Sequence, residues 1–418
     1  MGFKFEKEEQ KKETIFIQIA SYRDPELLPT LRDLFDKAKY PDNLHVCVAW
    51  QHSEEDEWDN LDEFKDDTRL TIIDIAYNEA KGACWARNLI QQEYKGETYT
   101  LQLDSHHRFI ENWDEECINM LKGLMNQGYD KPLLTSYIPS YDPERDPSGR
   151  VNSPWGMSFD RFTPEGIVFF LPYYIENKPL HPIKARFYSA HFAFTLGQHA
   201  VEVQHDPEYY FHGEEITLAV RSFTHGYDLF HPNKILAWHE YTRKGRVKQW
   251  DDDKSWGKRN TDCHRKVRSL LHVDNEQDIV EVKYGLGTVR TLQQYEEYAG
   301  IKFNERSITE RCKSNNLPPG SPDDIFNAEF KHAIGLHHSK FNESDYTFCA
   351  FIFEDENGSQ IHREDMGGEQ FNRQLQDSKN GKEWIVWKKY TGQVPTNIVI
   401  WPYSESKGWV EKQIQKFK

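Results

Sequence analysis

Short hydrophobic segments recur along the first hundred residues, and each is followed by a longer amphipathic stretch. Four of them, Thr14–Ala20, Leu44–Trp50, Leu70–Ala76 and Tyr99–Asp104, are apolar along nearly their whole length. Such runs are typical of strands buried on both faces of a parallel sheet. Because the stretches between them favour helices, the pattern predicts an α/β fold of the Rossmann-like kind, with ligands at the carboxyl ends of the strands.

Helices are expected between these strands. Asp24 is a plausible N-cap, with Pro25 at the first helical position, for a helix that runs to about Ala38. A second helix has an apolar face after the third strand, formed by Ala83, Ala86, Leu89 and Ile90.

The second half of the chain is less regular. Residues 142–182 indicate loops and short strands, and 289–303 predict a helix that closes the first domain. The stretch Glu214–Gly226 predicts a helix with Gly226 as a left-handed C-cap, and its apolar face is formed by Ile216, Ala219, Val220 and Phe223. After the turn-rich segment Asn315–Asp324, the apolar stretches are typical of strands, and no helix of similar length is predicted. The expected domains are an α/β catalytic domain (14–310), a linker (311–340) and a small β-rich domain (341–418).

Composition narrows the class of protein. With 418 residues, 37% hydrophobic, the chain has enough apolar side chains for a core, and a formal net charge of −16 argues against nucleic-acid partners. An acidic protein that handles an anionic substrate needs a divalent cation or a basic loop. Six cysteines without CxxC spacing, no apolar leader and no membrane-spanning run predict a soluble cytoplasmic protein with reduced thiols.

Candidate metal ligands follow the fourth strand, in "LQLDSHHRF" (Leu101–Phe109). Asp104 and His106 are two residues apart on an extended segment, so both point to the same side and can bind a Mn²⁺-type cation. A solvated turn is the alternative. His239, after another short apolar strand, is a candidate third ligand or merely a strand-end side chain, whereas His107 faces the opposite way and is expected to be structural.

Two further features allow two readings each. Glu214 and Glu215 begin a helix, where they either complement the helix dipole or face an acceptor hydroxyl. The basic segment Arg243–Asn260 is either a solvated loop or a loop that closes over a diphosphate.

Several motifs together resemble a known family. They are, in order, "SYRDPELLPTL", "KGACWARN", "LQLDSHHRF", "GEEITLAVRSFTHGYDLFHP", "WHEY" and "YGLGTVRTLQQYEEYAGIKF". They resemble the polypeptide N-acetylglucosaminyltransferases that modify hydroxyproline on a cytoplasmic ubiquitin-ligase adaptor, with their bacterial relatives. The polypeptide N-acetylgalactosaminyltransferases are more distantly similar. The likeness covers about Thr14–Phe303, and the β-rich end lies outside it.

The resemblance implies a GT-A fold, a UDP-sugar donor, Mn²⁺ or Mg²⁺, and retention of anomeric configuration. It implies that Asp104 and His106 form the Asp-x-His metal motif and that His239 is the distal metal ligand. Nucleotide and sugar contacts are implied for Tyr22, Arg23, Ala190 and His191, and Arg87 is implied to face the diphosphate. Arg243 and Lys244 begin the basic segment and are candidate diphosphate contacts on that ground alone. Glu214 and Glu215 correspond to the acidic motif that borders the acceptor.

The resulting hypothesis is a retaining glycosyltransferase that moves N-acetylglucosamine from UDP-GlcNAc to a hydroxyl acceptor on a protein (hydroxyproline, Ser or Thr) or a glycan. Three alternatives stay open: the same fold using another UDP-sugar on a bacterial polysaccharide, a non-catalytic sugar-binding protein, and a metal-dependent hydrolase. The sequence does not indicate the acceptor or the oligomeric state.

Overall fold

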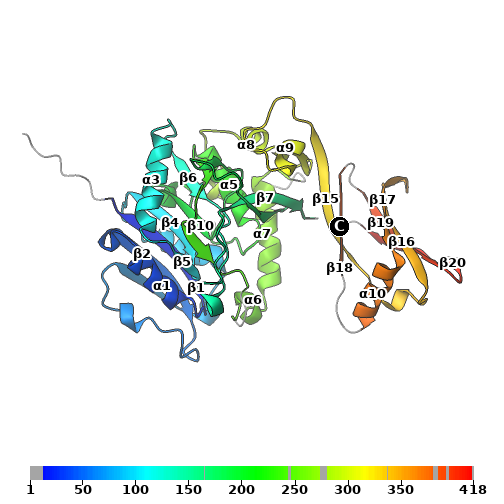
Figure 1. Ribbon diagram of the computed structural model, residues 1–418, viewed down its shortest axis with the longest axis horizontal. Helices are drawn as coiled ribbons and strands as arrows, with labels where there is room; N and C mark the ends of the chain where they lie inside the picture. Colours follow the sequence, from blue (N-terminus) through cyan, green and yellow to red (C-terminus); the bar gives the residue numbers. More distant parts are fainter. Residues whose placement is uncertain are drawn as a thin grey trace, which may run out of the picture. The chain divides into compact units, whose positions relative to one another are not determined.

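The structure, a computed structural model (Figure 1), describes residues 13–163, 165–242, 246–273, 280–336, 338–379, 385–391 and 395–416. The chain forms two compact units. The first is built from the described parts of Met1–Ser158, Leu171–Ala299 and Leu317–Pro319, and the second from those of Phe159–Phe170, Gly300–Asn316 and Gly320–Lys418.

A large mixed sheet forms the centre of the first unit, with strand order β3-β2-β1-β4-β10-β6-β11-β9. The strands are β1 (Ile15–Tyr22), β2 (Leu44–His52), β3 (Leu70–Ala76), β4 (Tyr99–Asp104), β6 (Pro132–Thr135), β9 (Ile183–Lys184), β10 (Phe192–Leu196) and β11 (Asp228–His231). β1 to β4 are mutually parallel, and β10 runs antiparallel to β4 and β6. The predicted α/β class, with a mixed and mostly parallel sheet between helices, is confirmed.

The helices of the first unit are α1 (Leu27–Asp36), α2 (Ala83–Gln91), α3 (Trp113–Met125), α4 (His199–Glu202), α5 (Glu214–Thr224), α6 (Gln249–Asp252), α7 (Trp256–Leu270) and α8 (Leu292–Ala299). The sheet is covered on both faces, with α1 and α3 on one and α2 on the other, whereas α7 and α8 pack on α5. Side chains alternate along β1, so Ile17 packs in the core with α1 and α3, whereas its neighbour Phe16 packs in the core with α2. The apolar runs seen in the sequence are therefore buried on both sides.

A two-stranded sheet beside the carboxyl end of β4 matters most for the site. β5 (His107–Phe109) follows β4 after two residues and pairs antiparallel with β12 (Ala237–His239), so that His239 lies opposite His107. This pairing joins segments that are more than a hundred residues apart in the chain.

The second unit has its own core. Its strands are β13 (Ile301–Lys302), β14 (Ser307–Thr309), β15 (Phe326–Gly335), β16 (Tyr346–Glu354), β17 (Gln360–Gly367), β18 (Ile385–Thr391), β19 (Asn397–Ser404), β20 (Gly408–Trp409) and β21 (Gln413–Lys416), with the helices α9 (Glu310–Lys313) and α10 (Gly368–Lys379). β7 (Trp155–Phe162) begins in the first unit and ends in the second, and β8 (Val168–Tyr174) begins in the second and ends in the first. α10 packs on β16 through Phe371 and Leu375, which belong to the buried cluster of this unit.

The structure differs from the predicted elements in five places. The first helix begins at Leu27 because Asp24 and Pro25 form a turn that precedes it. The basic segment Arg243–Asn260 contains α6 and the start of α7, whose buried face further along includes Cys263, Val267 and Leu270. α10 was not expected, and β15 lies in the segment expected to be a linker. The second unit also begins at Gly300 rather than after residue 310, because β13 and β14 are hydrogen-bonded into a sheet with β15.

Candidate functional site

The carboxyl end of β4 brings the three predicted metal ligands together. Asp104 is the last residue of β4, and His106 precedes β5. The backbone N–H of Glu240 donates to the carbonyl of His106 (3.1 Å), so the end of β12 lies directly against this turn. Asp104, His106 and His239 each offer a ligand atom within 4.8 Å of the others.

The spacing of these atoms suits a divalent cation. Oδ2 of Asp104 lies 3.3 Å from Nε2 of His239 and 3.8 Å from Nε2 of His106. Two ligands bound at about 2.1 Å, at angles between 90° and 110°, would lie about 3.0–3.5 Å apart. The Asp104–His239 distance of 3.3 Å falls in this range, and the Asp104–His106 distance of 3.8 Å exceeds it slightly. Nε2 of His106 is buried and has no hydrogen-bond partner in the described part of the chain. One carboxylate and two imidazoles, with one lone pair unused, therefore fit a metal of the Mn²⁺ type.

The protonation states of the buried side chains also favour a metal site. Burial lowers the pKa of His107, His191 and His239 well below the usual value for imidazole, so these rings are neutral. Burial alone would raise the pKa of Asp104, but the hydrogen bond with His239 and the charge of Arg87 bring it well below its usual range. A metal site needs this combination of an ionised carboxylate and neutral imidazoles.

Arg87 connects the metal candidates to helix α5. Its Nη2 donates to Oδ1 of Asp104 (2.6 Å), and its Nη1 donates to Oε1 of Glu214 (2.7 Å). The side chain is only 4% exposed. The family resemblance implies that Arg87 faces a diphosphate, whereas its guanidinium here is shared by two carboxylates. Its charge lies next to the candidate metal ligand, and its rigid fork fixes Asp104 relative to Glu214.

Glu215 lies in a different environment from Glu214. Its carboxylate accepts hydrogen bonds from the hydroxyl of Tyr137 (2.7 Å) and the backbone N–H of Ala190 (2.9 Å). Burial raises the pKa of Glu215 to about 7, although both hydrogen bonds act in the opposite direction. The ring of His191 stacks between those of Tyr137 and His239, at centroid distances of 5.2 and 4.2 Å. The predicted sugar-pocket residues Ala190 and His191 thus join Glu215 to the metal candidates.

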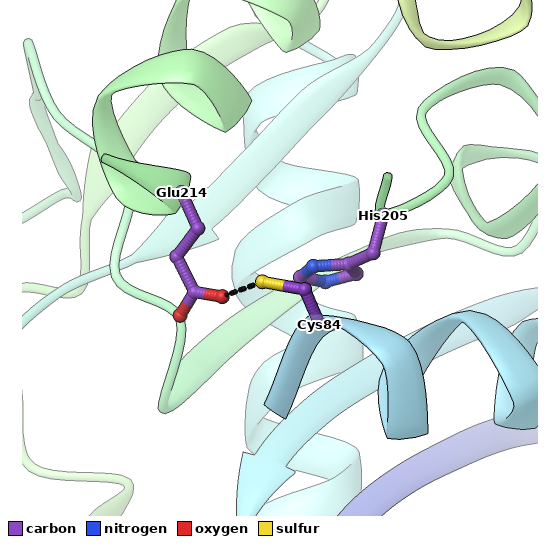
Figure 2. A group of neighbouring side chains, drawn as sticks. All are labelled: Cys84, His205 and Glu214. Atoms are coloured by element: carbon purple, nitrogen blue, oxygen red, sulfur yellow. Dashed lines mark hydrogen bonds between the residues drawn. The ribbon is translucent and has the colours of Figure 1, made fainter. Parts of the chain in front are cut away.

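A second group of potential ligands consists of Cys84, His205 and Glu214 (Figure 2). The Cys84 thiol donates to Oε2 of Glu214 at 2.5 Å, and burial, reinforced by the charge of Glu214, raises the pKa of this thiol well above its usual value. Sulfur and oxygen bound to one tetrahedral zinc would be about 3.5 Å apart. Nε2 of His205 is also engaged, 2.7 Å from Oε1 of Gln102. We therefore interpret this group as a buried hydrogen-bonded cluster that holds Glu214.

The predicted nucleotide residues Tyr22 and Arg23 lie at the end of β1, beside β4 in the sheet. Both contact Asp252 on α6: the Tyr22 hydroxyl donates to Oδ2 at 2.6 Å, and Arg23 forms an ion pair with the same oxygen at 3.1 Å. Arg23 also pairs with Asp56. Arg243 and Lys244 lie outside the described residues.

Sequence reasoning missed three charged residues at the site. Asp24 contacts His106, and Arg246 contacts Asp24 and forms an ion pair with Glu240. Asp24 was interpreted only as a helix cap. Glu240, in the "WHEY" motif, and Arg246, in the basic stretch, carried no signal of their own because surface charges are common in such segments.

Comparison with known proteins then identifies the family. The sequence model of the family described as "Glycosyltransferase (GlcNAc)" matches residues 14–70 and 59–305. The chain belongs to this family. It is therefore a glycosyltransferase by descent, and the Asp104, His106 and His239 cluster lies within the matched residues. No curated protein matches the sequence significantly.

Similar solved structures include GalNAc-T7 with UDP, GalNAc and Mn²⁺, at 12% identity, covering 96% of this chain and 69% of the other, with a TM-score of 0.49. TarS from S. aureus is 7% identical, with coverages of 96% and 85% and a TM-score of 0.36. The mannosyltransferase PcManGT from Pyrobaculum calidifontis, in complex with GDP-Man and Mn²⁺, is 12% identical, with 62% of each chain covered and a TM-score of 0.37. The family assignment rests on the sequence match.

Proposed function

We propose that the chain is a metal-dependent, retaining glycosyltransferase that transfers N-acetylglucosamine from UDP-GlcNAc to a hydroxyl group of a protein or glycan. The observation that carries this proposal is the convergence of Asp104, His106 and His239 at the carboxyl end of β4, inside the matched family region. Ligands of open α/β sheets bind at this edge. Hydroxyproline, serine and threonine hydroxyls are the proposed protein acceptors, by the resemblance of the motifs.

The donor set selects the cation. Two imidazoles and one carboxylate favour Mn²⁺ over Mg²⁺, which prefers oxygen ligands. The Asp104 side chain is 21% exposed, whereas those of His106 and His239 are 10% and 4% exposed, so the cation would be reached from the side of Asp104. When bound, the cation supplies electrostatic stabilisation of the charge that develops on UDP as it leaves.

The side chains of the protein have distinct roles in this mechanism. Asp104, His106 and His239 hold the cation, and the Arg87 charge strengthens the positive potential around it. Tyr22 and Arg23 contact the uridine side, and Ala190 and His191 line the sugar pocket. The acceptor hydroxyl attacks from the face of the leaving group and passes its proton to a diphosphate oxygen. Glu215 positions the acceptor, and Glu214 fixes Arg87.

All of these described residues belong to the first unit. We therefore assign catalysis to that unit and leave the second, β-rich unit outside the chemical step. In the described part of the chain, no helix has the length and apolar character needed to cross a bilayer. A cytoplasmic location is part of the proposal, supported by six buried cysteine thiols.

The test is a donor panel. The protein is incubated with Mn²⁺ and UDP-GlcNAc, UDP-GalNAc, UDP-glucose or UDP-galactose, and released UDP is measured. UDP-GlcNAc should be hydrolysed fastest, and Asp104→Ala should abolish this activity. Asp323→Ala, an exposed carboxylate of the second unit, is the matched control and should behave as wild type. Faster hydrolysis of another UDP-sugar would show that N-acetylglucosamine is not the preferred donor sugar. Normal turnover by Asp104→Ala would refute the proposed metal site.

Binding is tested separately by thermal unfolding. UDP should stabilise the protein mainly when Mn²⁺ is present, because a cation held by Asp104, His106 and His239 would supply the positive charge that binds the diphosphate. A non-catalytic sugar-binding protein predicts stabilisation by sugars without hydrolysis of any donor. A metal-dependent hydrolase predicts phosphate release from simple esters without any requirement for uridine.

A further inference from the structure

Asp24 lies between β1 and α1 and is almost completely buried, at 4% exposure. Its two carboxylate oxygens have different partners. Oδ1 accepts the backbone N–H of Glu26 (3.0 Å) in the turn that precedes α1. Oδ2 accepts the hydroxyl of Ser105 (2.7 Å) and lies 2.7 Å from Nδ1 of His106. One oxygen therefore shapes the turn, and the other faces a candidate metal ligand.

This contact decides where the proton of His106 resides. A separation of 2.7 Å between Nδ1 and a carboxylate oxygen is that of an N–H···O⁻ hydrogen bond, which favours a neutral ring with its proton on Nδ1. A neutral imidazole with its proton on Nδ1 has its lone pair on Nε2. That atom is the one that lies 3.8 Å from Oδ2 of Asp104 and has no other partner in the described part of the chain.

Arg246 is the competing partner of the same nitrogen. Its Nη1 lies 2.6 Å from Nδ1 of His106 and 2.7 Å from Oδ2 of Asp24. If Arg246 donated to Nδ1, the proton of His106 would move to Nε2 and block metal binding. The carboxylate oxygen is the better acceptor, because both the guanidinium and Nδ1–H can donate to it with charge assistance. Arg246 then balances the charge of Asp24 while His106 keeps Nε2 free.

We propose that Asp24 is a positioning residue that fixes the tautomer and ring orientation of His106, so that Nε2 is presented to the divalent cation. The proposal rests on the proposed function for the identity of the cation. Histidines that bind metals commonly donate their other N–H to a carboxylate, and loss of such a partner typically weakens metal binding 10- to 100-fold. Here the carboxylate comes from the segment that follows β1, so a residue outside the sheet orients a ligand in the turn between β4 and β5.

Asp24→Asn is the sharpest variant. The amide keeps the size of the side chain and an oxygen for the N–H of Glu26, but it can present an N–H to His106. Nδ1 would then become an acceptor and Nε2 would carry the proton. Ser105→Ala is the matched control, because it removes another donor to the same oxygen and keeps the carboxylate. The Ser105 hydroxyl also lies 3.4 Å from Nδ1 of His106, but Oδ2 of Asp24 is the nearer partner of that nitrogen at 2.7 Å.

The first measurement is Mn²⁺ affinity of the full chain, from electron paramagnetic resonance of free Mn²⁺. Asp24→Asn should bind about 10- to 100-fold more weakly than wild type, and Ser105→Ala should stay within about threefold, with native circular dichroism for both. Wild-type affinity in a folded Asp24→Asn protein would overturn the proposal.

The second measurement does not depend on the variant or the metal. Nitrogen-15 NMR of metal-free wild type, with His106 assigned by comparison with His106→Gln, should show the Nδ1–H tautomer. A proton on Nε2 would overturn the proposal even if Mn²⁺ binds. If wild type does not bind Mn²⁺ at all, the metal dependence of the proposed function is refuted. The position of the His106 proton, seen by NMR, then decides by itself whether Asp24 fixes the tautomer.

Discussion

At Glu215, burial changes the acid–base behaviour of one carboxyl group while its neighbour Glu214 is held in an ion pair. Glu215 accepts from Tyr137 and Ala190, and burial still raises its pKa to about 7. Its protonation state therefore changes near neutral pH, whereas Arg87 compensates the carboxylate of Glu214. Two adjacent carboxyl groups at the start of one helix thus differ in their protonation behaviour, because one pairs with a guanidinium and the other, among the described residues, does not.

Because the pKa of Glu215 is raised, we expect the free energy of unfolding to depend on pH. The pKa is raised in the folded state, so the contribution of this group is complete below the ordinary value of 4.5 and is lost as the pH rises through about 7. A shift of this size corresponds to about 3 kcal/mol. Urea unfolding of wild type between pH 4.5 and 8 should show this loss, and Glu215→Gln should remove most of it. An unchanged pH profile in the variant would contradict the assignment.

We expect removal of the Arg87 side chain to lower the free energy of unfolding strongly. Arg87→Ala leaves the partly buried carboxylate of Asp104 and the buried one of Glu214 without their cation, and breaking buried ion pairs of this kind costs about 3–5 kcal/mol. Urea unfolding should show this loss. Arg32→Ala, which removes an exposed pair with Glu63, is the control and should cause no measurable change. Equal stability of the two variants would argue against a structural role of Arg87.

At the level of elements, helix α5 is placed by the residue before it. Gly213 has a φ of +100°, and a Cβ at this position would lie 2.5 Å from Cγ2 of Val267 on α7. Backbone conformation and close packing therefore both require glycine at this junction. The position of Glu214 and Glu215 depends on it.

Gly213→Ala should therefore lower stability by about 2 kcal/mol or more, through strain and overpacking. It should also reduce donor hydrolysis, because α5 would shift. Gly257→Ala is the matched control: Gly257 lies in α7, has open space around its Cβ position, and should gain up to about 1 kcal/mol. Chemical denaturation and released UDP measure the two effects. A variant at position 213 as stable as wild type would contradict the packing argument.

Predicted elements hold best where the hydrophobic pattern is strong. β3 and β4 have the expected bounds, and Gly226 has the left-handed φ of +93° expected after α5. α10 was missed because only Phe371 and Leu375 mark its apolar face, one turn apart among polar residues. α2 buries Cys84 and Arg87 as well as Ala86 and Ile90, because the site uses a polar part of its face.

At the level of the whole molecule, each unit has a separate hydrophobic core. Separate cores can unfold in separate transitions. Calorimetry should therefore show two transitions, and UDP with Mn²⁺ should raise the temperature of only one, because all described candidate site residues belong to the first unit. Asp104→Ala should abolish that shift and leave the other transition unchanged. A single transition that shifts as a whole would show that the units unfold together.

The sequence by itself determined the α/β class, the four neighbouring parallel strands β1 to β4 of the main sheet and the candidate ligands, because apolar periodicity and residue chemistry are local properties. The tertiary structure decided which charges meet. It placed His239 opposite His107 through the pairing of β5 with β12, and it brought Asp24 to Nδ1 of His106. It also shared Arg87 between Asp104 and Glu214. Such contacts join residues far apart in the chain, and their energies depend on burial, which no local pattern specifies.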